Sequence, residues 1–334
     1  MAATLQDICR LTGYSSATVS RVINKSQLVK ESTREKVQGV MDEVNYFPMP
    51  SARALAGKRT GTIGVISPYG GSGFFSDIMV GVDSIAAERD VHVMMSFAHG
   101  VGDEEKLVVR FIQERSVDAV VVINIDLPGA FLASVKNDRV PLISVDTPAV
   151  EQGLPSISIG NRDGAHAMMS HLIEHGCHDI EIFAGPEISY DSRERIEGCR
   201  EAAAKAGLSL PDEKIHTGSF IVDSGREFMQ EILASGKPLP EAIFALNDVT
   251  AFGAMACLRD AGLSVPKDIA VVGFDNCEAS ALVGLTTVDV PLLDMGRYAA
   301  KMAFDAMDDE PEEMHVIVPA ELIIRESCGC CSAK

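Results

Sequence analysis

The sequence predicts an α/β protein: an N-terminal all-α head, followed by two Rossmann-like lobes. Within the first sixty residues, apolar side chains recur at helical spacing, and Gly13 interrupts them as the turn of a helix-turn-helix would. From Gly61 onward, short apolar runs alternate with amphipathic helices. A chain of 334 residues is long enough for two such series behind the head.

The head is expected to occupy residues 1–48 and to contain three helices. Thr4 and Ser15 are suited to cap the first two helices, and Ser32 with Glu35 predicts a capping box for the third. The expected helices are Thr4–Leu11, Ser16 to about Asn24, and a third from near Ser32 to just before Tyr46.

A linker of residues 49–60 follows the head. Pro50 suits a first helical turn, residues 51–56 favour helix, and Gly57 suits a helix end. A helix this short is unstable alone, so we expect it to form only against a surface.

The body contains eight apolar runs of strand length. They are Thr62–Ser67, Val91–Phe97, Ala119–Ile123, Pro141–Val145, Asp179–Phe183, Ile215–Phe220, Ala242–Ala245 and Ile269–Phe274. Between them lie amphipathic segments, among them Met79–Arg89, Ala165–His175, Arg195–Ala206, Gly225–Ala234 and Thr250–Ala261. Apolar runs divided by helices predict parallel sheets covered on both faces, with a ligand cleft at the carboxyl ends of the strands, between the lobes.

The charge is distributed unevenly. The whole chain carries −19, yet residues 1–60 carry +4 and the remainder −23. A basic head on an acidic body is expected where only the head contacts DNA phosphates. Asp7 and Arg10 interrupt any N-terminal signal segment, and no apolar run reaches the length of a membrane span. We therefore expect a cytoplasmic protein with no membrane partner.

Polar and aromatic side chains gather where the predicted strands end. Carboxylates, an amide and arginines at one cleft can donate to and accept from vicinal hydroxyls, and aromatic rings can pack against a sugar or base. The candidate ligand-binding residues are Phe74, Phe75, Asp146, Arg193, Arg195, Phe220, Asn247 and Asp275.

Two short motifs raise the question of a metal site. His171–His175 reads H-x-x-E-H, the string of one class of zinc peptidases, but Leu172 and Ile173 favour a helix packed on a sheet. Residues 328–331 contain C-x-x-C without a second ligand pair. We expect neither a metal nor a cofactor, and no catalytic residues stand out, so we do not expect an enzyme.

Head, linker and body together resemble the lactose-repressor/galactose-repressor family of bacterial transcription regulators. The motifs that carry the resemblance are Ala3–Ile8, Ala17–Asn24, Ser32–Val37, Asn45–Pro48, Gly61–Val65, Asn247–Asp248, Val272–Asp275, Leu285–Val288 and Arg325–Ser327. They span nearly the whole chain in order.

The resemblance implies that the second helix lies in the major groove, where Ser16, Ala17 and Arg21 read bases. A hinge helix at Ala52–Ala56 would place Leu55 in the minor groove as an apolar wedge. The resemblance also implies a homodimer on a near-palindromic operator. The further DNA contacts we expect are Thr18, Ser20, Asn24, Tyr46 and Arg53.

In the body, the resemblance implies lobes of the periplasmic-binding-protein type that bind an effector through Asp146, Arg195, Asn247 and Asp275, with Phe220 stacked on it. The expected effector-binding and dimerisation domain covers residues 61–334. Its N-lobe comprises about 61–160 and 290–319, and its C-lobe about 161–289 and 320–328.

We therefore expect a DNA-binding transcriptional repressor that a small ligand, a sugar or sugar derivative, controls allosterically from the interlobe cleft. A purine- or nucleoside-responsive regulator that needs a corepressor is the alternative, as is a regulator that answers a phosphoprotein. A sugar-binding transport protein shares the two-lobed body but would need a secretion signal and no DNA-binding head.

Overall fold

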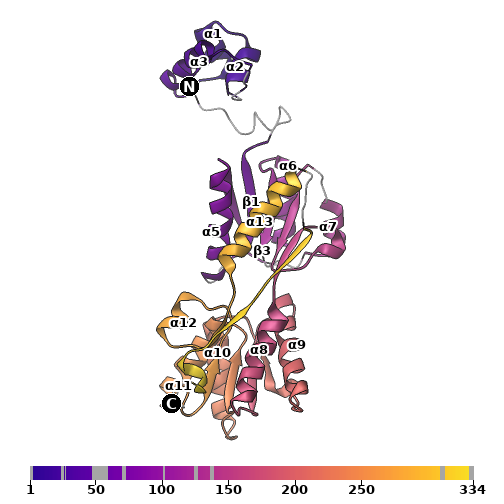
Figure 1. The fold of residues 1–334 in the computed structure, drawn as a ribbon, viewed down its shortest axis with the longest axis vertical. Coiled ribbons are helices and arrows are strands. Elements are labelled where there is room, and N and C mark those ends of the chain that lie inside the picture. Colours follow the sequence, from indigo (N-terminus) through magenta and orange to yellow (C-terminus); the bar gives the residue numbers. More distant parts are fainter. Residues whose placement is uncertain are drawn as a thin grey trace.

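The computed structural model describes residues 3–23, 26, 28–46, 59–69, 73–100, 102–123, 127–135, 139–308 and 313–330. Figure 1 shows three head helices in indigo and two α/β lobes, one above the other. The expected hinge helix, with Arg53 and Leu55, and the expected contact Asn24 lie outside the described residues.

The head is a bundle of α1 (Leu5–Thr12), α2 (Ser16–Ile23) and α3 (Glu31–Glu43). Thr4 forms a capping box with Asp7, and the Ser15 hydroxyl accepts a hydrogen bond from the Thr18 amide, so both predicted caps are confirmed. The helices bury one small apolar core, made by Ile8, Val19, Val22, Val37 and Met41.

One detail of the head differs from the prediction. The Lys30 carbonyl accepts hydrogen bonds from the amides of Thr33 and Arg34, so α3 begins at Glu31 and Ser32 is already inside its first turn. The predicted capping box between Ser32 and Glu35 is therefore wrong. Lys30 occupies the N-cap position, and its side chain makes no capping hydrogen bond.

The N-lobe is built on a six-stranded parallel sheet in the order β11-β5-β4-β3-β1-β2. Its strands are β1 (Thr62–Pro68), β2 (His92–Ala98), β3 (Ala119–Ile123), β4 (Leu142–Val145), β5 (Ser156–Ile159) and β11 (His315–Val318). Helices α5 (Gly73–Glu88) and α13 (Leu292–Met307) cover one face, and α6 (Asp103–Glu114) and α7 (Gly129–Val135) cover the other. The α5 and α13 backbones approach closely at Gly81 and Gly296, where a Cβ on Gly81 would lie 2.1 Å from the Leu293 carbonyl oxygen.

The C-lobe repeats this plan with a four-stranded parallel sheet in the order β7-β6-β8-β9. Its strands are β6 (Ile180–Ala184), β7 (Ile215–Thr217), β8 (Ala242–Ala245) and β9 (Ala270–Val272). Helices α8 (Asn161–Glu174) and α9 (Tyr190–Lys205) cover one face, and α10 (Val222–Ala234) and α11 (Asp248–Asp260) cover the other. The short α12 (Glu278–Leu282) and the 3-10 turns η1 (Val150–Gln152), η2 (Asp212–Lys214) and η3 (Glu326–Cys328) complete the body.

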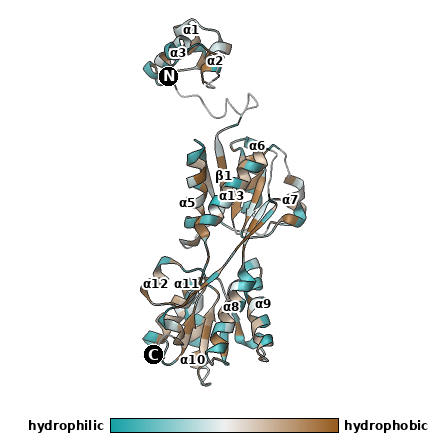
Figure 2. Cartoon of the chain, viewed as in Figure 1, coloured by the Kyte–Doolittle hydropathy of each residue, from teal (hydrophilic) through white to brown (hydrophobic). Residues whose placement is uncertain are grey.

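The chain passes between the lobes at residues 160, 290–291 and 319–320, because the elements on either side belong to different lobes. Two of these passages leave from or lead into β10 (Thr287–Asp289) and β12 (Glu321–Ile323), which pair antiparallel and run diagonally from lobe to lobe in Figure 1. Figure 2 shows apolar strands inside both lobes and hydrophilic colour mainly on the outer helices. Three such passages of the chain can act as a hinge between two rigid lobes.

The predicted fold class is confirmed, and the differences lie in single elements. The predicted strand at Ile215–Phe220 ends at Thr217, and β5, β10 and β11 were not predicted. In β5 the hydroxyls of Ser156 and Ser158 are buried against the two ring nitrogens of His315 on β11, at 2.9 and 3.3 Å. Two serines in the buried strand β5 and a half-buried histidine in the edge strand β11 interrupt the apolar pattern that would have predicted these strands.

Candidate functional site

The outer surface of α2 is the first candidate site. Ser16, Ala17 and Arg21 are exposed, whereas Val19 and Val22 on the opposite side are buried in the head core. Thr18 and Ser20 are half-buried beside them. A short helix that is fixed on one side and presents small polar side chains and an arginine on the other can enter a DNA major groove.

Tyr46 lies at the edge of the same head. Its amide donates to the Met41 carbonyl just after α3, and its ring packs against the head core. Burial raises the pKa of its hydroxyl above the ordinary value. The residue therefore helps to close the bundle, in addition to the DNA contact that the sequence predicts.

The second candidate site is a cleft of about 770 Å³ between the lobes, within the size range of small-molecule sites. Both lobes line it, and of the predicted ligand-binding residues Phe74, Phe75, Arg195, Phe220, Asn247 and Asp275 do so. Asp146 lies behind this lining and is fully buried. Arg193 is exposed outside it, since its guanidinium donates to the carbonyls of Glu187 and Ile188.

Arg195 is the centre of the polar network in the cleft. The side chain, on α9, is 2% exposed, and its guanidinium lies over the Phe274 ring at 3.8 Å. It donates to the Asn161 side-chain oxygen at 2.7 Å, to the Leu246 carbonyl at 2.5 Å and to an Asp275 carboxylate oxygen at 3.2 Å. These bonds come from three separate segments, so Arg195 is held rigidly in place.

Asp146 directly follows β4 of the N-lobe and faces Asp191 of the C-lobe. Among the described residues, neither Asp146 carboxylate oxygen has a hydrogen-bond donor from an amide, a hydroxyl or a cation. Burial, and next the charge of Asp191, raise the pKa of Asp146 well above its ordinary value. Asp191 itself accepts a hydrogen bond from the Asn161 amide at 2.8 Å.

Asp275 lies beyond the end of β9, on the other side of Arg195. Burial raises its pKa to about 8 even though the Arg195 guanidinium opposes that rise. The pKa values of both Asp146 and Asp275 are therefore raised, because burial outweighs the opposing charge of the Arg195 guanidinium at each of them.

The next layer of side chains holds the loops that end the strands. Asp248 accepts hydrogen bonds from Ser280 and Thr287 at 2.5 Å each and from the Cys277 amide at 2.9 Å. Asn247 caps α11 through its side-chain oxygen and donates from its nitrogen to the Phe220 carbonyl at 3.1 Å. Asn247 is therefore a helix cap and a cleft residue at once.

The backbone is strained at the same positions. Seven non-glycine residues in the described part of the chain have a positive φ, and three of them are Asp146 (76°), Phe220 (56°) and Asp275 (107°). Such conformations persist only where the surroundings impose them, and they concentrate at functional sites. Their coincidence with the cleft supports the assignment of this site.

Aromatic rings form the apolar walls. The Phe220 ring lies on Gly185, where a Cβ would be 2.1 Å from a ring carbon. Phe74 and Phe75, in the first turn of α5, pack edge to face with ring centroids 5.3 Å apart. Rings from two lobes can therefore enclose a flat or partly apolar ligand.

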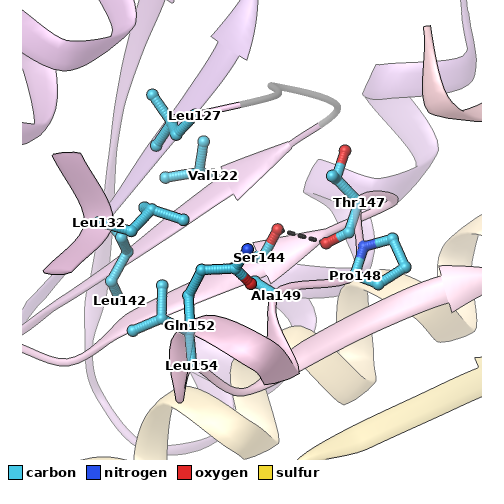
Figure 3. Close-up of a pocket in the computed structure, with 10 residues that line it drawn as sticks. All are labelled: Val122, Leu127, Leu132, Leu142, Ser144, Thr147, Pro148, Ala149, Gln152 and Leu154. Atoms are coloured by element: carbon cyan, nitrogen blue, oxygen red, sulfur yellow. Dashed lines mark hydrogen bonds between the residues drawn. The ribbon is translucent and has the colours of Figure 1, made fainter. Parts of the chain in front are cut away.

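A smaller cavity of about 30 Å³ adjoins the cleft inside the N-lobe. Figure 3 shows its mainly aliphatic lining, with Leu127 and Thr147 shared with the cleft, and the hydrogen bond of 2.6 Å from the Ser144 hydroxyl to the Thr147 carbonyl. The volume suits about one water molecule, so the cleft is the ligand-sized space.

Sequence reasoning missed Asn161, Asp191, Tyr69 and Tyr190, which lie in or behind the cleft. Asp191 lies two residues before the predicted Arg193 in α9, and Asp191 lines the cleft whereas Arg193 does not. Helical geometry offers a signal, because Asp191 and Arg195 are four residues apart and share a face of α9.

The structure also holds the point where the linker enters the body. Arg59 donates to the Met307 carbonyl at 2.7 Å and to the Asp308 carboxylate at 2.6 Å, at the end of α13. The Asp118 carboxylate accepts hydrogen bonds from the amides of Thr60 and Gly61. No described helix is long and apolar enough to cross a membrane.

Comparison with known proteins identifies the head and part of the body as known domains. Residues 4–49 match the model of bacterial regulatory proteins of the lacI family, and residues 169–328 match a periplasmic binding protein-like domain. The HTH-type transcriptional repressor PurR of Vibrio vulnificus (strain CMCP6) is 31% identical over 97% of this chain and 98% of its own.

Solved structures give the same result. A lac repressor dimer bound to operator and the anti-inducer ONPF superposes with a TM-score of 0.87 at 27% identity, covering 98% of this chain and 99% of that one. A complex of the transcriptional regulator CelR with cellobiose gives 0.72 at 28% identity, covering 97% and 99%. The chain belongs to the lacI family of bacterial regulatory proteins and is a DNA-binding transcriptional repressor.

Proposed function

We propose that this repressor binds a palindromic operator as a homodimer and is controlled by a polyhydroxylated ligand, a sugar or sugar derivative, in the interlobe cleft. The observation that carries the proposal is the group of buried carboxylates Asp146, Asp191 and Asp275 around the single guanidinium of Arg195. Sugar hydroxyls are donors as well as acceptors, so they can donate hydrogen bonds to the carboxylates of Asp146 and Asp275.

A purine or nucleoside is the second candidate. It is favoured by the similarity to PurR repressors and by the rings of Phe74, Phe75 and Phe220, which could enclose a planar base. The acidic network is less suited to it, because a purine offers few N–H donors and several acceptors that would face carboxylates. The cellobiose complex of CelR shows that a relative of this fold binds a sugar.

The ligand would act by favouring one separation of the lobes. Asp146 follows a strand of the N-lobe sheet, and Asp275 follows a strand of the C-lobe sheet. A ligand bonded to both therefore binds one interlobe arrangement better than another and shifts the population toward it. Through α13 and Arg59 this arrangement would set the distance between the two linkers of a dimer.

On DNA, α2 would read the major groove of each half-site. Arg21 can pair bidentately with a guanine, and Ser16 and Ala17 offer a hydroxyl and a methyl contact. Thr18 and Ser20 suit phosphates, which fix the register. Two heads related by a dyad require a near-palindromic operator.

A thermal-shift screen with monosaccharides, disaccharides, nucleosides and bases tests the proposal. A ligand that binds the native state raises its melting temperature, and about 100-fold excess over Kd adds about 2.7 kcal/mol. We expect at least one sugar to give a shift that Asp275→Asn reduces, and to change operator affinity in one direction. If only purines or nucleosides raise the melting temperature, the ligand is the second candidate and not a sugar.

A further inference from the structure

Three potential metal ligands from distant parts of the sequence meet in the C-lobe, away from the carboxylate network. The Nε2 atom of His171 and the Sγ atoms of Cys328 and Cys330 all lie within 4.8 Å of one another. His171 comes from the first of the two motifs discounted above, and the cysteines come from the second. Neither motif alone contains enough metal ligands for a site, and the fold brings ligands from both motifs together.

Local structure explains how the three side chains converge. His171 lies in the last turn of α8, and Cys328 ends η3. Gly329 then adopts φ +80°, a conformation natural to glycine, and so turns the chain. As a result the Cys328 and Cys330 sulfurs are only 3.1 Å apart on the same side of the turn.

The imidazole is oriented but incompletely used. His171 Nε2 is buried, no amide, hydroxyl or carboxylate among the described residues bonds to it, and the imidazole interacts with the Cys328 thiol. His175, one turn later, stacks on it with ring centroids 4.3 Å apart and donates from Nδ1 to the His171 carbonyl at 2.7 Å. His175 is exposed and takes no part in the cluster, so the H-x-x-E-H string does not act as a peptidase pair.

We propose that His171, Cys328 and Cys330 form a binding site for a soft d10 cation, with Zn²⁺ as the expected ion. Imidazole and thiolate are the ligands that Zn²⁺ favours, at about 2.0–2.1 Å for nitrogen and 2.3 Å for sulfur. Tetrahedral geometry then separates two thiolates by about 3.8 Å. The sulfurs need to part by well under 1 Å from their present distance to reach it.

Binding releases two protons to solvent, one from each thiol, and leaves the neutral imidazole to donate its Nε2 lone pair. Water takes the fourth position, since three protein ligands are present. The cation would fasten residues 328–330 to the end of α8. This role requires nothing from the interlobe ligand, so the two proposals can fail independently.

A plain thiol pair is the main alternative. Two cysteines 3.1 Å apart could also form a disulfide if an oxidant removes two electrons and the two thiol protons. A disulfide joins only the two sulfurs, whereas a cation would bind all three ligand atoms, so a metal titration distinguishes the two.

Metal titration of the full chain tests the site. The protein is reduced, stripped of metal with a chelator, titrated with Co²⁺ as an optical probe, and then back-titrated with Zn²⁺. We expect one ion per chain and a sulfur-to-cobalt charge-transfer band that Zn²⁺ removes. His171→Gln, and the double change Cys328→Ser with Cys330→Ser, should weaken binding at least about 100-fold.

Matched controls separate ligation from general damage. His175→Gln alters the neighbouring histidine of the same helix, and Cys277→Ser alters a half-buried C-lobe thiol beside the Ser280 hydroxyl; both should bind Co²⁺ as the unaltered chain does. Alkylation of the unaltered chain needs no variant, because Zn²⁺ should protect Cys328 and Cys330 but not Cys277.

Three results would overturn the site. They are the lack of a charge-transfer band in the reduced, unaltered chain, binding that survives both ligand variants, and equal alkylation of the three cysteines with and without Zn²⁺. A reduced chain that binds no metal but readily forms a Cys328–Cys330 disulfide would identify a redox pair instead.

Discussion

The reading surface of α2 and the interlobe cleft are built in opposite ways. The α2 surface comes from eight consecutive residues, and Ser16, Ala17 and Arg21 point outward from a helix fixed by a small core. The cleft comes from both lobes, and its central group, Arg195, is buried and bonded to three separate segments.

This difference determines what a substitution can do. A side chain on the α2 surface can be removed without disturbing the fold, so its loss should affect binding alone. A cleft side chain also holds loops and neighbouring charges, so its loss should affect binding, stability and pH response together. The predictions below test that contrast.

Arg21→Ala should have the largest effect. A bidentate arginine–guanine pair contributes about 1–3 kcal/mol of discrimination, and a dimer would lose two, so specific operator affinity should fall by about 2–6 kcal/mol. Fluorescence anisotropy on an operator selected from random DNA measures the loss, and the melting temperature should stay unchanged because Arg21 is exposed.

Arg110→Ala is the control for Arg21, since Arg110 is an exposed arginine on α6 with an (i, i+4) partner in Glu114. It should bind the operator normally. Equal losses on selected and random DNA in Arg21→Ala would mean that this residue contacts phosphates instead of bases.

Asp275→Asn should rank second. Above pH 8, where Asp275 is ionised, its carboxylate would accept hydrogen bonds from the ligand beside Arg195, and a bond to a charged group contributes about 1.5–3 kcal/mol. Ligand affinity should therefore fall about 10- to 150-fold, while operator binding without ligand persists. Isothermal titration with the sugar found by thermal shift measures this change.

Asp212→Asn provides the matched control, because the Asp212 side chain is 91% exposed in η2. If both variants bind the ligand as tightly as the unaltered chain does, Asp275 does not contribute to ligand binding.

The same contrast explains how far sequence reasoning reached. The α2 surface depends on helical spacing and two caps, Thr4 and Ser15, which are local signals. Six of the predicted residues line the cleft, and they lie after strands or in the first turns of helices, where the topology of parallel sheets places ligand sites. Arg193 could not be told from Asp191 by such rules, because one helix turn exposes the first and buries the second.

The features that the sequence does not predict depend on contacts between distant segments of the chain. Neither Asn161 nor Asp191 has a sequence pattern that reveals its bond to the other, and the serines of β5 look polar until His315 is placed beside them. The His171–Cys328–Cys330 cluster is a further case, since the two motifs are separated by more than half of the body.

The pH response should come third. Because the pKa of Asp275 is raised to about 8, the folded chain binds more protons than the unfolded chain between the ordinary value of 3.8 and about 8. The stability from this group is therefore present at low pH and lost as the pH rises through 8. Well inside that window, each pH unit lowers the free energy of unfolding by about 1.4 kcal/mol. From pH 6 to 8 the loss is about 2 kcal/mol, because Asp275 in the folded chain is already half ionised at pH 8.

Urea unfolding of the ligand-free chain at pH 6, 7 and 8 measures this loss, with Asp275→Asn as its control. The variant should show a shallower pH dependence, leaving the part that comes from Asp146, whose pKa is also raised. Parallel curves for the two proteins would show that Asp275 does not titrate in this window.

The smallest effect should come from the contact between the linker and the body. Arg59 bonds to the end of α13, and its guanidinium lowers the pKa of the Asp308 carboxyl below the ordinary value. Both side chains are about half exposed, so Asp308→Asn should leave the melting temperature nearly unchanged. If α13 transmits lobe movement through Arg59, the factor by which the ligand changes operator affinity should differ between Asp308→Asn and the unaltered chain. We expect that difference to be less than about fivefold.

Operator affinity with and without saturating ligand gives this ratio for the unaltered chain, Asp308→Asn and the control Asp294→Asn. Asp294 pairs with Arg297 at the opposite end of the same helix, so its loss removes a comparable exposed ion pair without touching the linker. A ratio that changes only in Asp308→Asn would assign the coupling to the Arg59 contact. Ratios equal in all three proteins would mean that the lobes act on the DNA-binding head by another route, and that the cleft and the α2 surface are joined less directly than this ion pair indicates.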